Sequence, residues 1–154
     1  MTPIWKLLHL FFSFSFVGTL VVADWNSRAA RRTADWSQRA LLFGIVQMSS
    51  RVAGLGSLLL LGVLGNLQSV KLGLRMADDP WVRWVNGLWL AALLLMLLLT
   101  LPSLARLTAA AQAAAGGGSA AGYDEALRRW RLANVALSLL YLALLVLMVF
   151  RPLH

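Results

Sequence analysis

His9 is the residue whose type and position offer the clearest chemistry. It lies about five residues into an apolar run that begins at Ile4, about 8 Å along a helix axis. A neutral imidazole can coordinate haem iron or copper, and it can also donate or accept a hydrogen bond. At helical spacing one face carries Trp5, His9, Phe12, Ser13, Phe16 and Leu20. His9 is therefore the leading candidate for a ligand or an interhelical polar contact.

Two asparagines are expected at a similar depth. Asn66 lies four residues before the end of the apolar run that finishes at Val70, and Asn86 lies two residues into the next run. If these runs are neighbouring helices, His9, Asn66 and Asn86 form a polar cluster within one half of a bundle. One hypothesis is that they form interhelical hydrogen bonds worth about 0.6–2 kcal/mol each. The other is that His9 binds haem b or copper.

A metal or haem site needs further ligands, and the sequence offers few. His154 is the terminal residue, while Met96 and Met148 are thioether alternatives, of which Met148 lies nearer the same end. There is no cysteine, and no acidic residue falls inside an apolar run, so neither thiolate sites nor a carboxylate pair for general acid–base catalysis is expected. The glycines Gly54 and Gly56 lack the lysine of a phosphate-binding loop. The residues therefore predict no catalytic site.

The composition is typical of a membrane protein. Of 154 residues, 60% are hydrophobic and 13% charged, and the mean hydropathy is +0.73. A soluble domain has roughly 45–50% apolar and 25% charged residues. The remaining surface is expected to face lipid. The net charge of +8 arises from small basic groups between apolar runs, without the basic groove of a nucleic-acid interface, so nucleic acid is not an expected partner.

Four apolar stretches are long enough to cross a hydrocarbon core of about 30 Å as helices. They cover residues 4–23, 52–70, 84–101 and 132–150. The first, at about 19 residues, exceeds a signal-peptide core of about 7–15, so we expect it to be retained. The sequence thus predicts an all-α fold, a four-helix antiparallel bundle forming one membrane domain over residues 1–154.

Arg51 and Pro102 decide where the second stretch begins and where the third ends. A second span centred on Arg51 would place a guanidinium at membrane depth, at a cost of about 3 kcal/mol or more. We therefore start this span at Val52, which leaves Arg51 at the interface and residues 40–48 as an interfacial extension of the same helix. The third span is expected to stop at Pro102, because proline removes a helical hydrogen bond.

Basic residues favour one orientation. One side of the membrane would hold both termini and five basic residues, which are Lys6, Lys71, Arg75, Arg83 and Arg151. The other side would hold nine, which are Arg28, Arg31, Arg32, Arg39, Arg51, Arg106, Arg128, Arg129 and Arg131. Because positive charge is enriched in cytoplasmic loops, both termini are predicted to lie outside.

The loops and small residues predict further features. Residues 109–122 form an Ala- and Gly-rich cytoplasmic loop, whose alanines extend the third helix and whose glycines are flexible; the fourth helix restarts near Tyr123. Small residues at four-residue spacing allow helix backbones to approach closely. They are Gly65, Ser69 and Gly73, with Gly62 four residues before Asn66. Packing inside the bundle and a dimer contact both remain open.

Four short strings carry a family resemblance. Residues 6–9, 79–81, 128–130 and 147–152, in this order, resemble the bacterial family of integral membrane proteins called domain of unknown function 2269. The resemblance covers nearly the whole chain and implies a multi-pass protein of the bacterial cytoplasmic (inner) membrane with no assigned activity. The chain is also distantly similar to copper resistance D-type proteins and to membrane-bound protoporphyrinogen oxidase. In both, a histidine near the start of the first helix serves metal or haem, and His9 matches that position.

The leading functional hypothesis is a non-enzymatic small bundle, or a subunit of a membrane assembly. Its partners would be the lipid bilayer and, in an assembly, other membrane helices or a second copy of the chain. One alternative is a haem-binding redox or porphyrin-handling protein that uses His9. The other is a copper-handling membrane protein.

Overall fold

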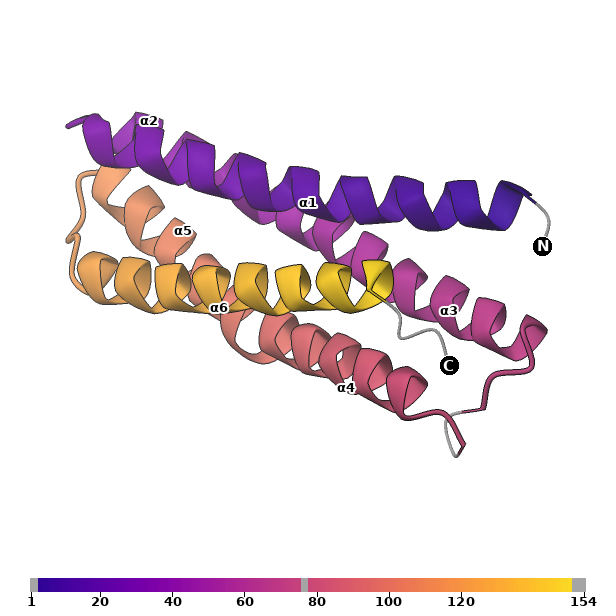
Figure 1. Ribbon diagram of the computed structural model, residues 1–154. Helices are drawn as coiled ribbons and strands as arrows, with labels where there is room; N and C mark the ends of the chain where they lie inside the picture. The colour runs from indigo at the N-terminus through magenta and orange to yellow at the C-terminus, as the bar shows by residue number, and fades with distance from the viewer. Residues whose placement is uncertain (1–2, 76–77, 151–154) are drawn as a thin grey trace.

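The computed structural model describes residues 3–75 and 78–150, and throughout these ranges the only regular secondary structure is helical. Four helical segments are each long and apolar enough to cross a membrane. The start of α1 and the end of α6 lie toward the same end of the molecule (Figure 1). The all-α class and the four spanning-length helices expected from the sequence are confirmed.

The first segment is longer than its apolar stretch. Helix α1 covers Pro3–Arg32, so it continues well past residue 23. Its last turns carry an exposed pair in which Arg28 lies 2.9 Å from Asp24. Only residues 33–35 separate it from the next helix. The basic residues that follow the first apolar stretch are therefore mostly helical, because they continue the helical ladder beyond the apolar run.

The second segment is one continuous helix with a wide turn in its middle. It consists of α2 (Trp36–Ser49), a π-helical turn η1 (Ser50–Gly54) and α3 (Leu55–Lys71). The side chain of Asp35 caps α2 by accepting a hydrogen bond from the Ser37 amide at 2.8 Å. Arg51 is exposed and lies about 30 Å along the helix axis from Lys71, which is close to the thickness of a hydrocarbon core.

The third segment passes through its proline. It consists of α4 (Pro80–Leu95), a π-helical turn η2 (Met96–Thr100) and α5 (Leu101–Ala115). The sequence predicts that the span stops at Pro102, but the helix itself continues without a break through this residue to Ala115. The π-helical turn lies directly before the proline, where the wider coil accommodates the missing N–H and the proline ring. Within the turn, the Thr100 hydroxyl donates to the Leu95 carbonyl at 3.2 Å, so that carbonyl is satisfied.

The fourth segment begins where the sequence predicts. Helix α6 covers Tyr123–Val149 and follows Gly122, whose φ of 81° suits a residue without a Cβ. Glu125 in its first turn forms an ion pair with Arg129 at 2.6 Å. The connection from α5 is limited to residues 116–122, so the alanines of the expected loop extend the helix.

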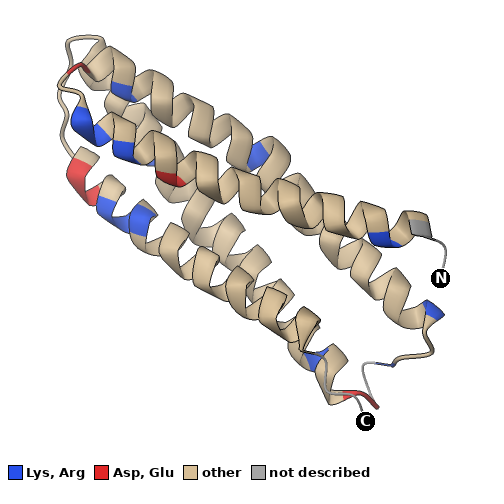
Figure 2. Cartoon of the chain, turned by 45° about the horizontal axis from the view of Figure 1, so that its top comes forward, with Lys and Arg blue, Asp and Glu red and all other residues tan. Residues whose placement is uncertain are grey.

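Two hydrophobic cores hold the segments together. The first joins α1, α2, α5 and α6 around Phe43, Leu104 and Trp130. The second joins α1, α3, α4 and α6 around Phe16, Leu58 and nearby side chains. Figure 2 shows most of the Lys and Arg residues near the two ends of the chain's long apolar region. The first core lies at the arginine-rich end, and the second supports the cavity described next.

Candidate functional site

A cavity of about 470 Å³ lies between α1, α3, α4 and α6, toward the end of the molecule where α1 begins. Leu, Val, Phe and Trp side chains form much of its wall. Its polar lining residues are His9, Ser13, Asn66, Gln68, Ser69, Asn86 and Tyr141. Pockets for small molecules commonly have about 300–1,000 Å³ and few polar groups within an apolar lining. The cavity therefore has the size and character of a ligand site.

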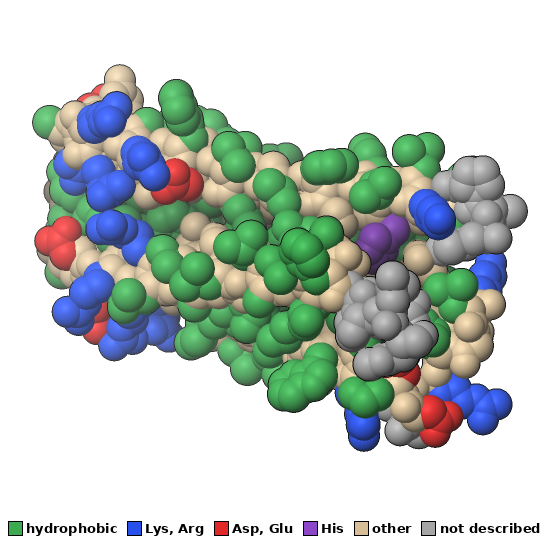
Figure 3. All heavy atoms as spheres, viewed as in Figure 1, with side chains coloured by type: hydrophobic (Ala, Val, Ile, Leu, Met, Phe, Trp, Pro, Cys, Tyr) green, Lys and Arg blue, Asp and Glu red, His purple; other side chains and the backbone are tan. Residues whose placement is uncertain are grey.

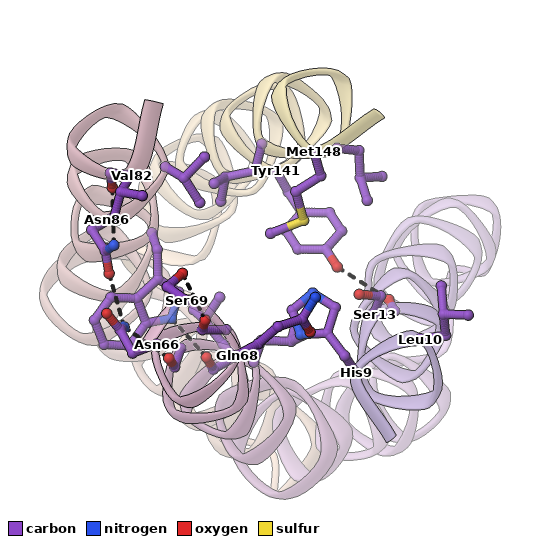
Figure 4. Close-up of a pocket in the computed structure, with 18 of the residues that line it drawn as sticks. His9, Leu10, Ser13, Asn66, Gln68, Ser69, Val82, Asn86, Tyr141 and Met148 are labelled. Atoms are coloured by element: carbon purple, nitrogen blue, oxygen red, sulfur yellow. Dashed lines mark hydrogen bonds between the residues drawn. The ribbon is translucent and has the colours of Figure 1, made fainter. Parts of the chain in front are cut away.

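His9 contributes a buried ring nitrogen to the cavity wall. Its Nδ1 is buried and has no hydrogen-bond partner within residues 3–75 and 78–150. Gly65 lies opposite, so that a Cβ at this position would be 3.7 Å from His9 Cε1. Figure 4 shows the imidazole reaching from α1 into the space between the helices. Because a buried polar atom without a partner is unfavourable, a ligand that bonds to it would be stabilised there.

Asn66 and Asn86 form a direct contact between α3 and α4. The Asn66 amide donates to the Asn86 side-chain oxygen at 2.8 Å and to the Gly62 carbonyl at 2.9 Å. The Asn86 amide donates to the Val82 carbonyl at 2.9 Å. The structure thus brings His9, Asn66 and Asn86 to one cavity, but the two asparagines bond to each other and not to the histidine (Figure 4). The two asparagines therefore link α3 to α4.

Hydrogen bonds also join the other pairs of helices around the cavity. Tyr141 on α6 donates its hydroxyl to the Ser13 carbonyl of α1 at 3.3 Å. The remaining bonds link Ser57 to Ser15 at 3.0 Å, and the Trp81 indole to the Leu147 carbonyl at 2.8 Å. Since lipid provides no hydrophobic force between helices, such bonds and close packing are expected to keep the walls in place.

Gly62 and Trp89 set the spacing of α3 and α4. A Cβ at Gly62 would lie 2.1 Å from Cε2 and Cζ2 of Trp89, so the indole lies directly on the glycine. The Trp89 Nε1 donates to the Leu58 carbonyl at 2.8 Å. Gly65 faces His9, and Ser69 bonds to the Gly65 carbonyl at 3.0 Å. Gly62 and Gly65 therefore face side chains of the same bundle, whereas nothing in the described chain lies within 4 Å of a Cβ at Gly73, and the dimer contact stays a prediction.

Of the other candidate ligands that the structure describes, one lines the cavity and one does not. Met148 lines the cavity, and Figure 4 shows its sulfur directed into the same space as His9. Met96 is 2% exposed and packs in the second core, outside the cavity lining. His154 lies outside the described residues. No group of three or more His, Cys, Asp or Glu side chains gathers anywhere in the described chain.

These residues fit copper poorly and haem b only in part. His9 and Met148 are two donors, fewer than the three that a blue-copper site takes before any axial ligand. For haem b, the same pair offers two axial ligands. No Lys or Arg belongs to the described lining to pair with the propionates. A neutral molecule meets the chemistry of the cavity more completely.

The sequence reasoning missed two polar residues of the wall. Gln68 is an amide within the second apolar stretch, and Tyr141 is one of two tyrosines in the chain. Their polarity inside apolar runs was a usable signal. The partner of Tyr141 is the Ser13 carbonyl, 128 residues away, which no local pattern indicates.

Comparison of the chain with protein-family models, curated proteins and solved structures gives no match in any of the three. The resemblance to the family of unknown function stays a prediction. The geometry of the cavity is therefore the basis for a functional proposal.

Proposed function

We propose that this chain is a non-enzymatic, multi-pass protein of the bacterial cytoplasmic membrane that binds a neutral apolar small molecule beside His9. Its four segments would form an antiparallel bundle with both termini outside. The observation that carries the ligand proposal is the unpartnered Nδ1 of His9 at the wall of an apolar cavity of about 470 Å³.

The outer surface of the helices supports placement in lipid. Phe14, Leu98 and Val149 are 72%, 66% and 74% exposed, and similar apolar side chains lie on all four segments. Soluble monomers rarely expose large contiguous apolar patches. The sequence count of nine basic residues on the side of the first and third loops, against five on the side of the termini, supports the orientation.

The expected ligand has an apolar body and at least one oxygen. A ligand hydroxyl within reach of His9 would satisfy the imidazole in either tautomer, because a hydroxyl both donates and accepts. A ligand carbonyl only accepts, so it would satisfy only the tautomer that carries its proton on Nδ1. On α1 and α6 the cavity is lined by apolar side chains that also lie at the surface: Leu10 is 52%, Phe14 72% and Val149 74% exposed. A ligand dissolved in the bilayer would therefore enter between these two helices.

Haem b is the second candidate, because His9 and Met148 both line the cavity. His9 would hold the iron through its imidazole, and the haem would supply electron-transfer chemistry. Membership of a larger assembly has weaker support. Gly62 and Gly65, two of the small residues whose spacing also suits a dimer contact, lie against Trp89 and His9 of the same chain.

The test is to identify what co-purifies with the protein from native membranes. Mass spectrometry of an organic extract would detect a neutral ligand, and an absorption spectrum would detect haem. Gly65→Leu would place a side chain in the cavity and is expected to lower ligand retention at least about fivefold, because one lost hydrogen bond to a buried group already accounts for about 1–1.5 kcal/mol. Gly18→Leu is the matched control, since nothing lies within 4 Å of a Cβ at this α1 position.

Equal retention by the Gly65 and Gly18 variants would contradict the proposed cavity site. A Soret band that disappears in His9→Ala would replace the neutral ligand by haem. If the extract and the spectrum both show nothing bound, the ligand proposal fails and the structural role of the cluster remains.

A further inference from the structure

A second groove lies between α1 and α6 at the arginine-rich end of the molecule. Its volume is about 560 Å³, and it is separate in its lining residues from the cavity beside His9. Four arginines line it, together with one aspartate and one tryptophan. They are Arg28, Arg31, Arg32 and Arg131, with Asp24 and Trp130. Figure 3 shows basic side chains gathered at this end of the α1–α6 face.

The groove has an excess of positive charge. Asp24 pairs with Arg28 at 2.9 Å, and Arg31 uses its Nε to bond the Ser27 carbonyl at 3.3 Å. Neither Arg32 nor Arg131 has an ion-pair partner among the described residues. Four guanidinium groups face one carboxylate, which favours an anion, and Arg is the side chain best suited to phosphate oxygens.

Trp130 adds an independent sign of a ligand. The residue is 1% exposed, lines the groove and has no hydrogen-bond partner for its Nε1 within the described chain. Its ring is held edge-on by Phe43, with 5.9 Å between the centroids. An indole N–H is a donor only, so the group that satisfies it must be an acceptor.

The position of the groove favours a lipid over a free anion. Asp24 follows the predicted end of the first span, and Arg131 precedes the predicted start of the fourth. Exposed apolar residues continue from the groove along both helices toward the centre of the predicted spans. They are Val21 on α1, and Leu132, Val135 and Leu139 on α6. A lipid bound here would have its anionic headgroup among the arginines and its acyl chains on these apolar faces.

We infer that this groove binds the phosphodiester headgroup of an anionic glycerophospholipid at the cytoplasmic surface. The phosphate oxygens accept from Arg32, Arg131 and the Trp130 indole, while the acyl chains lie along α1 and α6. Basic pockets between membrane helices on this side commonly bind such headgroups. The site rests on the proposed membrane placement but not on the ligand beside His9, so either can fail alone.

The test uses the full chain, delipidated in detergent and analysed by native mass spectrometry. It is titrated with phosphatidylglycerol, with phosphatidylcholine of the same acyl chains, and with inorganic phosphate. Wild type is expected to bind phosphatidylglycerol at least tenfold more tightly than the other two. The double variant Arg32→Gln/Arg131→Gln is expected to bind it about 25-fold less tightly, since each basic residue near an anionic headgroup contributes about 1 kcal/mol and 1.4 kcal/mol is tenfold.

Arg106→Gln/Arg128→Gln is the matched control, because it removes two charges from the same end of the molecule and neither residue lines the groove. It should bind as wild type does. Trp130→Phe, which removes only the N–H and part of the ring, should weaken binding about tenfold.

Four results would overturn the inference. Equal binding of the two lipids would remove the headgroup preference. Inorganic phosphate that binds as tightly as the lipid would make this a free-phosphate site. An equal loss in the control double variant would show a general effect of charge, and unchanged binding in Trp130→Phe would exclude the proposed indole contact.

Discussion

The hydrogen bond between Asn66 and Asn86 shows how single polar residues act in this bundle. Its 2.8 Å length and its place between α3 and α4 give it a direct role in helix association. Each amide also donates to a carbonyl of its own helix, so the pair leaves few unsatisfied groups. His9 differs, because its Nδ1 has no such partner among the described residues. The asparagines therefore join two helices, and the ligand contact that we propose belongs to the histidine.

A double-mutant cycle tests the asparagine contact. Asn66→Leu and Asn86→Leu, alone and together, should give a coupling of about 0.6 kcal/mol and at most about 1.7 kcal/mol, the range found for hydrogen bonds between membrane helices. The measurement is reversible unfolding in mixed micelles. Asn26→Leu with Asn86→Leu is the control pair, because the Asn26 amide bonds only within α1, to the Val22 carbonyl at 2.8 Å. A coupling as small as that of the control pair would mean that the contact does not stabilise the bundle.

At the scale of the helices, close approach at glycines determines how the segments pack. The two π-helical turns meet where a Cβ at Gly54 would lie 3.2 Å from Met96 Cε and 3.3 Å from Thr19 Oγ1. Farther along α3, Trp89 lies on Gly62. Both contacts use the absence of a side chain. The helices are therefore positioned by particular glycines and not by hydrophobic length alone.

Gly62→Ala is expected to destabilise the protein by about 1–3 kcal/mol, as overpacking does in a close-packed core. The added Cβ would displace a rigid indole and its hydrogen bond to Leu58. Gly56→Ala, in the same helix, meets nothing within 4 Å and should be neutral or stabilising by up to about 1 kcal/mol through helix propensity. Thermal unfolding in detergent compares the two. Equal melting temperatures would contradict the packing of Trp89 on Gly62.

At the scale of the whole molecule, the two cores belong to two environments in the proposed placement. The core around Trp130 and Phe43 lies at the arginine-rich end, where water is near and apolar burial is favourable. The core around Phe16 and Leu58 lies between the long apolar segments, where packing and hydrogen bonds replace that force. All four helical segments are longer than a membrane span needs. Each is therefore long enough to contribute to the membrane region and also to the region at the arginine-rich end.

The proposed orientation is testable with single cysteines, since the sequence has none of its own. Ser119→Cys lies in the exposed connection between α5 and α6, and Asp78→Cys lies in the exposed connection between α3 and α4. A membrane-impermeant maleimide should label Asp78→Cys in cells with an opened outer membrane, and Ser119→Cys only after the cytoplasmic membrane is permeabilised. The reverse pattern of labelling would place both termini inside.

The sequence by itself determined the helical class, the four long segments and the start of α6 at Tyr123. These depend on local properties, which are the length of the apolar runs and the positions of glycines. Local rules were insufficient at Pro102, because they describe the usual end of a helix and not the π-helical turn that lets this one continue.

Only the tertiary structure decided which side chains meet. The contacts that shape the cavity join residues far apart in the chain, 20 positions for Asn66 and Asn86, 31 for Leu58 and Trp89, and 128 for Ser13 and Tyr141. Their existence depends on the distances and rotations between helices, which the glycines and the indole of Trp89 set. His9 could be predicted as a candidate functional residue from its type and depth alone. The cavity around it could not, because an apolar run specifies a helix and leaves open what packs against each of its faces.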